Sequence, residues 1–255
     1  MATVLHSESV LITGGSEGIG LGLARRFLAR GATVLVTGRS AAKLATAAKA
    51  LPGLATLEND IGDPSQRKLL AEHVRESLPG LTWVINNAGI QRRIPLAVDD
   101  APWDERQREI DILLAAPIHL NHLLVPILLS QRRPTTVVNV TSGGAYVPQV
   151  FAPVYSACKA ALHHYTVVLR HALANTQCRV VELAPPAVQT SLAISSRGAP
   201  LDDFCDAVFD ALMSGSATAL GYGPTSDIER RSSEELTQLF TQSAQRADVV
   251  RYHGN

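Results

Sequence analysis

Short apolar runs alternate with longer segments of mixed polarity along most of this chain. The runs are mostly continuous, as in TVLVT at 33–37 and TVVNV at 136–140, which is typical of strands covered on both faces. By this pattern we expect strands at 9–13, 33–37, 54–58, 81–86, 135–141, 179–183 and 217–222. The segments between them predict helices at 19–30, 41–51, 65–77, 103–130, 153–174, 202–214 and 232–246.

This alternation of strands and helices predicts an α/β fold. Successive strand–helix units place their strands in a parallel sheet, with helices on both of its faces in a doubly wound arrangement. At 255 residues the chain can bury a large core. No composition break, low-complexity linker or repeat divides it, so we expect one domain over 1–255 with a polar helical extension at about 226–255.

The expected helix at 103–130 contains a segment, ILLAAPIHLNHLLVPILL at 112–129, that is apolar enough to resemble a membrane span. Its polar residues His119, Asn121 and His122 favour a buried or interface helix over a bilayer helix. The first nine residues are polar and do not resemble a signal peptide. We therefore expect a soluble, cytoplasmic protein without a membrane partner.

Charge and cysteine content narrow the partners and the compartment further. Lys plus Arg and Asp plus Glu both number 23, so no net basic field favours binding to nucleic acid or an anionic membrane. The cysteines, Cys158, Cys178 and Cys205, lie far apart and cannot all pair, which is typical of a reducing compartment. His163 and His171 share a helix face, but no further ligands accompany them, so we expect no metal site.

A glycine-rich turn follows the first expected strand. Residues 10–20 read VLITGGSEGIG, in which Gly14 permits a tight turn, Gly18 lets the backbone approach a pyrophosphate and Gly20 allows close helix–strand packing. The helix that begins there offers unpaired N–H groups and the positive end of its dipole to phosphates. This strand–turn–helix context predicts a dinucleotide site.

The end of the second expected strand indicates which dinucleotide is bound. Proteins that bind NAD place Asp or Glu there, on the ribose 2′-hydroxyl, whereas this chain has Arg39, which could pair with a 2′-phosphate. Arg39 therefore favours NADP(H) over NAD(H). Glu17, inside the glycine turn, argues mildly the other way, because we expect its charge near the same phosphate.

Tyr155 and Lys159 are four residues apart on an expected helix and hence share one face. A tyrosine with an ordinary pKa near ~10 is a poor proton donor and acceptor at neutral pH, and a nearby ammonium stabilises its phenolate. Ser142, at the end of an expected strand, could hydrogen-bond the reacting oxygen. This arrangement indicates acid–base chemistry at a carbonyl or alcohol.

With these motifs in their order and spacing, the sequence resembles the short-chain dehydrogenase/reductase family over roughly residues 8–225. The motifs are the glycine turn at 13–20, Asp60, NNAG at 86–89, Ser142 and the Tyr155/Lys159 pair. Together with PPAVQT at 185–190, they are most similar to the branch named after the oxidoreductase of the D-alanyl-lipoteichoic-acid operon. The resemblance implies a Rossmann-type sheet of seven parallel strands and hydride transfer between a nicotinamide and a carbonyl or alcohol carbon.

The same resemblance implies a role for each matching residue. Tyr155 would be the general acid in reduction and the base in oxidation, Lys159 would hold the nicotinamide ribose and lower the tyrosine pKa, and Ser142 would position the substrate oxygen. Asp60 would contact the adenine and Thr190 the carboxamide. The expected cofactor-binding residues are Thr13, Gly14, Ser16, Glu17, Gly18, Ile19, Gly20, Arg39, Asp60, Ile61, Asn87, Ala88, Gly89, Tyr155, Lys159, Pro185, Val188 and Thr190.

Two positions depart from the family pattern. Leu113 stands where many members have an Asn that supports a water relay from the lysine, which puts full catalytic competence in doubt. Pro186 replaces the usual glycine after the sixth strand and stiffens the turn over the nicotinamide.

The substrate is expected to bind to loops beyond the strand ends. These loops offer the mostly apolar residues Tyr146, Phe151, Val188 and Leu192, which favour a small apolar ketone, aldehyde or secondary alcohol. Arg92 and Arg93 could attract an anionic substrate, although we interpret them as solvated loop residues.

Two other functions remain open at this point. Leu113 allows a catalytically impaired NADP(H)-binding sensor or scaffold, and a sugar-nucleotide epimerase would use the same tyrosine but needs a larger substrate domain. The segments 103–130 and 153–174 carry more apolar surface than one buried face requires. We therefore expect a homodimer or homotetramer formed through them.

Overall fold

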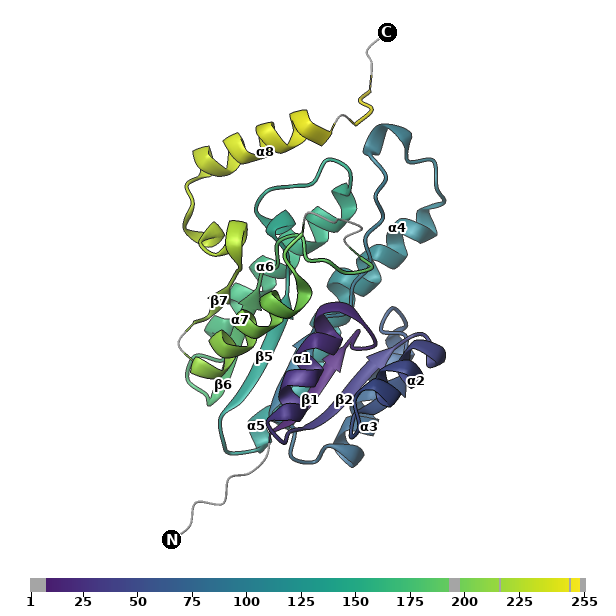
Figure 1. The fold of residues 1–255 in the computed structure, drawn as a ribbon, viewed down its shortest axis with the longest axis vertical. Helices are drawn as coiled ribbons and strands as arrows, with labels where there is room; N and C mark the ends of the chain where they lie inside the picture. The colour runs from purple at the N-terminus through teal and green to yellow at the C-terminus, as the bar shows by residue number, and fades with distance from the viewer. Residues whose placement is uncertain (1–7, 193–197, 216, 248, 253–255) are drawn as a thin grey trace.

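The computed structural model describes residues 8–192, 198–215, 217–247 and 249–252. Within them, seven parallel strands form one sheet in the order β3-β2-β1-β4-β5-β6-β7 (Figure 1). The strands are β1 (Ser9–Thr13), β2 (Thr33–Gly38), β3 (Ala55–Glu58), β4 (Trp83–Asn86), β5 (Thr135–Val140), β6 (Cys178–Leu183) and β7 (Ala219–Leu220). The predicted doubly wound α/β fold is confirmed, with each strand near its expected position.

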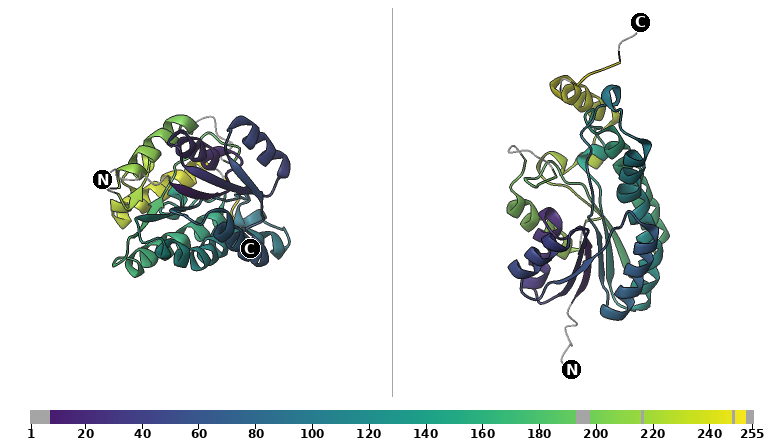
Figure 2. Two further views of the ribbon diagram at one scale, coloured as in Figure 1. Left: turned by 90° about the horizontal axis from the view of Figure 1, so that it is seen from below. Right: turned by 90° about the vertical axis from the view of Figure 1, so that its right-hand side faces the viewer.

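Helices cover both faces of this sheet (Figure 2). They are α1 (Gly18–Ala29), α2 (Ala41–Ala50), α3 (Pro64–Ser77), α4 (Trp103–Ile110), α5 (Ala116–Ser130), α6 (Pro153–Ala172), α7 (Leu201–Ser214) and α8 (Ser233–Ala247). One core joins the sheet to α1, α2 and α7, with Phe27 and Phe204 fully buried, and the other joins it to α3, α5 and α6, with Leu70 and Leu120 fully buried.

The order of the strands determines where ligands can bind. β1 pairs with β2 on one side and with β4 on the other, so the chain winds outward in opposite directions from β1. In such sheets a crevice opens at the carboxyl ends of the strands beside this switch point. The loops after β1, β2, β4, β5 and β6 therefore meet at one edge of the sheet, and α8 lies beyond that edge (Figure 1).

The expected helix at 103–130 is divided into three parts. A π-helical turn, Asp111–Ala115, separates α4 from α5. Pro117 has no amide hydrogen to donate to the carbonyl of Leu113 four residues earlier, so an ordinary α-helix cannot continue there unchanged. This turn widens the helix opposite the catalytic end of α6.

Among the described residues, one helical stretch, Trp103–Ser130, is long and apolar enough to cross a membrane. Four of its apolar side chains, Ile112, Leu120, Leu124 and Leu128, are buried against the sheet. This is the packing of a core helix in a soluble domain, as expected from its polar residues.

Candidate active site

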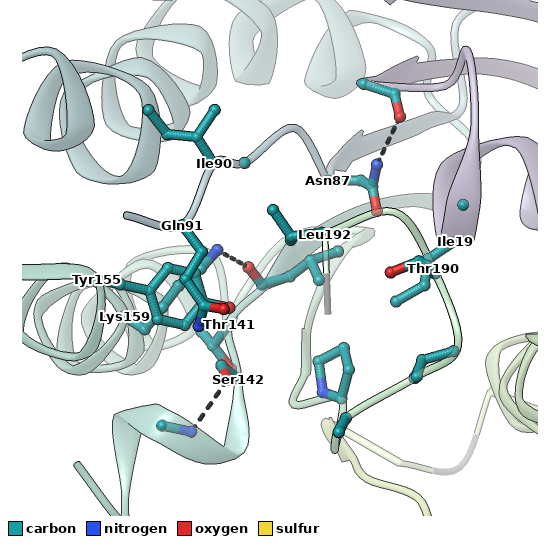
Figure 3. A pocket seen from close by; sticks show the side chains of 18 of the residues that line it. Ile19, Asn87, Ile90, Gln91, Thr141, Ser142, Tyr155, Lys159, Thr190 and Leu192 are labelled. Carbon is teal, nitrogen blue, oxygen red and sulfur yellow. Dashed lines mark hydrogen bonds between the residues drawn. The ribbon is translucent and has the colours of Figure 1, made fainter. Parts of the chain in front are cut away.

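A cleft of about 1020 Å³ lies at the carboxyl edge of the sheet. The glycine turn, the ends of β2, β4 and β5, and the loop after β6 all contribute to its walls. In Figure 3, Ser142, Tyr155, Lys159 and Gln91 gather on one side, while Asn87, Ile19 and Thr190 lie across from them. The structure thus brings together the cofactor and catalytic residues that the motifs predict.

Backbone geometry explains the glycines of the turn after β1. Gly14 has a φ of +66°, and a Cβ on it would lie 2.6 Å from Cα of Ala88. A Cβ on Gly20 would lie 2.5 Å from the carbonyl oxygen of Gly14 and 2.6 Å from Nδ2 of Asn87. The Asn87 amide donates to the carbonyl oxygens of Thr13 (3.0 Å) and Gly14 (2.9 Å), so β4 holds the turn in place.

The turn also presents the start of α1 to the cleft. Glu17 is the N-cap residue, yet its side chain accepts no capping hydrogen bond from the helix. Its carboxylate instead accepts hydrogen bonds from Lys43 Nζ (2.5 Å) and Ser191 Oγ (3.0 Å). The bond from Lys43 holds the pKa of Glu17 below its ordinary value. The first N–H groups of α1 therefore remain open towards the cleft, and the charge of Glu17 is paired.

Three polar residues line the end of the cleft near β2 and β3: Arg39, Asp60 and Asn59. Burial raises the pKa of Asp60, but hydrogen bonds from Arg108 and the Gly62 amide outweigh it and hold the pKa below its ordinary value. Asn59 Oδ1 is buried and has no hydrogen-bond partner among the described residues.

The catalytic residues predicted from the sequence lie together at the end of β5 (Figure 3). Tyr155, which is 8% exposed, shares a hydrogen bond with Ser142, whose Oγ also accepts one from the Gly144 amide at 3.0 Å. Lys159 is buried, and its Nζ donates to the carbonyl oxygen of Val140 at 2.7 Å. The ammonium lies 5.7 Å from the centre of the Tyr155 ring.

The pKa of Tyr155 is shifted in the opposite direction to the one we expected. We predicted that Lys159 lowers its pKa, whereas burial raises the pKa of Tyr155, and the charge of Glu109 adds to the rise. The hydrogen bond from Ser142 lowers it but does not compensate. Burial also lowers the pKa of Lys159 to about 8. The raised pKa keeps Tyr155 protonated at neutral pH but makes it a weaker acid than an ordinary tyrosine.

Tyr146 is the expected substrate residue that does not line the cleft. Its hydroxyl donates to Glu182 Oε1 (3.2 Å) and lies 3.1 Å from Nδ1 of His163. Glu182, which is 1% exposed, also accepts from Thr141 Oγ1 at 2.7 Å. A buried carboxylate needs such partners, so it draws the tyrosine away from the cleft. This cluster instead supports the backbone on both sides of Ser142.

The other expected substrate residues, Phe151, Val188 and Leu192, do line the cleft. Thr13 and Gly20 lie beneath its surface, where the Thr13 hydroxyl accepts from the amides of Asn87 and Ala88, both at 3.1 Å. Every other expected catalytic or cofactor-binding residue is part of the wall.

Several lining residues had no motif to predict them. They are Lys43, Asn59, Gln91, Arg93, Gln149 and residues of the C-terminal region, including Arg231, Leu239 and Arg246. Gln91 Nε2 donates to Gln149 Oε1 at 2.7 Å, a bond that joins the loops after β4 and β5. Of the two loop arginines, Arg92 is paired with Asp99 at 3.0 Å and with Glu105 of α4 at 3.2 Å, whereas Arg93 lies over the ring of Phe151 at 4.3 Å.

Leu113 lies in the π-helical turn and is 1% exposed. It packs with Ala152, Tyr155 and Cys158, and its Cδ2 would lie 3.3 Å from a Cβ on Gly89. An apolar contact with the catalytic helix therefore occupies the position that is Asn in many relatives.

Comparison with known proteins agrees with this geometry. A family model described as short chain dehydrogenase matches residues 8–200. The chain belongs to the short-chain dehydrogenase family. The uncharacterized oxidoreductase DltE of Bacillus subtilis (strain 168) is 44% identical over 193 residues, which are 76% of this chain and 76% of that protein. The resemblance drawn from the motifs, including the branch, is confirmed.

Two further short-chain dehydrogenase relatives are informative. NADPH-dependent 1-acyldihydroxyacetone phosphate reductase of Schizosaccharomyces pombe is 36% identical over 72% of this chain and 60% of that protein. The crystal structure of a short chain dehydrogenase from Burkholderia cenocepacia J2315 in complex with NADP has a TM-score of 0.76 and 24% identity, covering 95% of this chain and 96% of that chain. The chain is thus an oxidoreductase of the family that acts on CH–OH and C=O groups.

Proposed function

We propose that this protein is an NADP(H)-dependent oxidoreductase that transfers hydride between the nicotinamide and a small ketone, aldehyde or secondary alcohol. The observation that carries the proposal is the joint position of Ser142, Tyr155 and Lys159 in one cleft behind an open glycine turn. We also propose that the described elements and the C-terminal helix form one functional unit over 1–255.

Each catalytic residue has a task that its surroundings support. Tyr155 is protonated at neutral pH, and its hydroxyl beside Ser142 is placed to deliver this proton to the carbonyl oxygen during reduction. Ser142, bonded to Tyr155 and fixed by the Gly144 amide, orients the same oxygen. Lys159 carries its charge beneath them and is anchored on Val140, where it can hold a ribose hydroxyl.

The wall of the cleft suits a dinucleotide. The open N–H groups of α1 would face a pyrophosphate. A bound NADPH supplies the hydride for reduction. Arg39 supports NADP(H) over NAD(H), because the competing charge of Glu17 is paired with Lys43.

The substrate side supports an apolar environment around the reacting carbon. Phe151, Val188 and Leu192 line it, together with Val147. The intact set of Ser142, Tyr155 and Lys159 gives no support to the alternative of an impaired sensor. We further propose a cytoplasmic homodimer or homotetramer, because α6 exposes Val167 and Val168 and α5 exposes Leu129.

The test measures NADPH consumption against a panel of ketones and aldehydes. Tyr155→Phe removes one hydroxyl and leaves the ring, so we expect the rate to fall by roughly 10²- to 10⁴-fold. NADPH affinity, followed by fluorescence titration, should change little. A wild type that binds NADPH and reduces no carbonyl would favour the sensor, and a variant that keeps the wild-type rate would overturn the role of Tyr155.

A further inference from the structure

Glu182 is a buried carboxylate that the proposed chemistry does not use. It lies on β6, which pairs with β5 on one side and with β7 on the other, and it is 1% exposed. Among the described residues, it accepts hydrogen bonds from the side chains of Thr141, Tyr146 and His163. A buried charge is costly unless it is paired, so these three donors and the carboxylate hold one another in place.

One oxygen of Glu182 closes the turn that holds Ser142. Oε1 accepts from Thr141 Oγ1 at 2.7 Å and from the Tyr146 hydroxyl at 3.2 Å. Ser142 lies between these two donors and caps the short 3₁₀ helix that ends just before Tyr146. We call residues 141–146 the Ser142 turn. A single oxygen atom therefore fixes both ends of the Ser142 turn against β6.

The other oxygen of Glu182 contacts the helix that carries Tyr155 and Lys159. Oε2 lies 2.7 Å from Nδ1 of His163. His163 is four residues after Lys159 and eight after Tyr155, so the three side chains share one face of α6. The carboxylate thus joins the Ser142 turn to α6 behind the catalytic residues.

The bond between Glu182 and His163 has the character of an ion pair. Burial raises the pKa of Glu182, but the hydrogen bonds from His163 and Thr141 outweigh it and hold the pKa below its ordinary value. The bond to Glu182 raises the pKa of His163. Burial and the charge of Arg170 oppose this rise, whereas the charge of Glu229 adds to it. Both shifts favour a charge-assisted hydrogen bond, which is shorter and stronger than a neutral one.

Stability of the sheet alone does not require this arrangement. Replacing a buried ion pair by apolar side chains of similar volume is often neutral or stabilising. The neighbours of Glu182 on β6, Val181 and Leu183, are fully buried apolar residues. The strand therefore changes from apolar packing to a bonded carboxylate at the position that contacts both the Ser142 turn and α6.

We propose that Glu182 is a positioning residue, whose carboxylate fixes the Ser142 turn relative to the helix of Tyr155. This inference rests on the proposed oxidoreductase function and adds a residue on which turnover depends. Glu182 is not part of the described wall of the cleft, so it acts through the side chains bonded to it. In this way the hydroxyls of Ser142 and Tyr155 meet the same substrate oxygen.

The first experiment removes each hydroxyl of the Ser142 turn and measures reduction of the ketone or aldehyde that the wild type reduces fastest. In Tyr146→Phe and in Thr141→Val we expect kcat to fall by roughly tenfold to a hundredfold, as for a small misplacement of a catalytic group. Thr141→Ser keeps the hydroxyl and should retain most of the wild-type kcat. NADPH affinity, measured by fluorescence titration, should change little in Tyr146→Phe, because Tyr146 is outside the described wall of the cleft.

Thr82→Val is the matched control. Thr82 is 1% exposed, and its Oγ1 donates to Glu8 Oε2 at 2.6 Å just before β4, at the opposite end of the sheet. The change removes a similar hydroxyl–carboxylate bond and should leave kcat unchanged. Glu182→Met removes both acceptor oxygens. In that background Thr141→Val should lower kcat little further, because the threonine acts through the carboxylate.

The second experiment measures the Ser142 turn without turnover, by hydrogen exchange and mass spectrometry of peptides that cover 141–147 in the full-length protein. Exchange should rise by about tenfold or more in Tyr146→Phe and stay at the wild-type rate in Thr82→Val. Wild-type kcat in both Tyr146→Phe and Thr141→Val overturns the positioning role and leaves the oxidoreductase standing. Faster exchange in Tyr146→Phe, when the wild type reduces no carbonyl, supports the link through Glu182 and counts against the proposed function.

Discussion

Two charged side chains at the nucleotide end of the cleft bear on the choice of cofactor. Arg39 is exposed at the end of β2, and Glu17 lies in the glycine turn. Glu17 accepts hydrogen bonds from Lys43 and Ser191, so much of its charge is compensated within the protein. The charge that remains available to a 2′-phosphate is that of Arg39.

From this we expect NADPH to bind at least about tenfold more tightly than NADH, a difference of about 1.4 kcal/mol. Arg39→Asp should abolish or reverse the preference, because a carboxylate repels the phosphate and accepts from a ribose hydroxyl. Titration of both cofactors measures it, with Arg30→Asp as a control for the change of charge. Equal affinities in the wild type would refute the assignment.

Lys159 gives a pH dependence of stability with a definite sign. Its pKa in the folded chain is about 8, whereas a lysine in the unfolded chain titrates near ~10.4. Between these pH values the unfolded chain holds a proton that the folded chain has released, so the free energy of unfolding rises with pH. Below about pH 8 both states hold the proton, and the cost of burying the charge is present in full.

Urea unfolding at about pH 8 and pH 10 tests this dependence. Between these two pH values, the free energy of unfolding of the wild type should rise by on the order of 2 kcal/mol more than that of Lys159→Met. Lys49→Met, an exposed lysine at the end of α2, is the matched control and should parallel the wild type. If the free energies of unfolding of the wild type and Lys159→Met change equally between the two pH values, the lysine is not held at a lowered pKa.

At the scale of elements, the interrupted helix Trp103–Ser130 places Leu113 next to α6, the helix that carries Tyr155. Leu113 is the main departure from the family pattern. The π-helical turn before Pro117 carries Leu113 against Tyr155 and Cys158. The resemblance to the family implies an Asn at this position, which would support a water relay. The chain therefore has an apolar contact where the family pattern has a polar one.

Leu113→Asn restores the polar group, and we expect kcat to stay level or rise. Because the site is buried, the same change should lower the free energy of unfolding by about 1–3 kcal/mol. Steady-state kinetics and urea unfolding measure the two effects, and Leu113→Ala separates loss of the leucine from gain of the amide. A lower kcat for the Asn variant than for the Ala variant would argue against the relay.

The elements show which features a single sequence can predict. Strand cores and helices were placed within a few residues because apolar runs and helical periodicity are local signals, as in β1 (Ser9–Thr13). The catalytic and cofactor residues followed from the spacing of motifs. The inward turn of Tyr146 was not predictable, because its partners Glu182 and His163 lie on β6 and α6. Likewise, nothing local in α8 indicates that Arg246 lines the cleft.

At the scale of the whole molecule, the arrangement of helices leaves apolar surface outside both cores. Val168 is 66% exposed and Val167 44% exposed on α6, and Leu129 is 42% exposed at the end of α5. These helices lie on the face of the sheet opposite α1 and α7 (Figure 2). A second copy of the chain would cover this surface in a closed assembly, as we propose.

Val168→Arg tests the proposed assembly, because a charge at the centre of an apolar contact loses its hydration without gaining a partner. We expect the wild type to be a dimer or tetramer by light scattering at micromolar concentration and the variant to shift towards the mass of one chain. The matched control is Leu69→Arg on α3, which places the same charge at an apolar residue that is 61% exposed and lies outside α5 and α6. It should leave the mass unchanged. Far-ultraviolet circular dichroism separates dissociation from unfolding, since a variant that keeps the wild-type spectrum has lost only its partner. A wild type with the mass of one chain would overturn the assembly, and a Val168→Arg variant with the wild-type mass would move the interface away from α6.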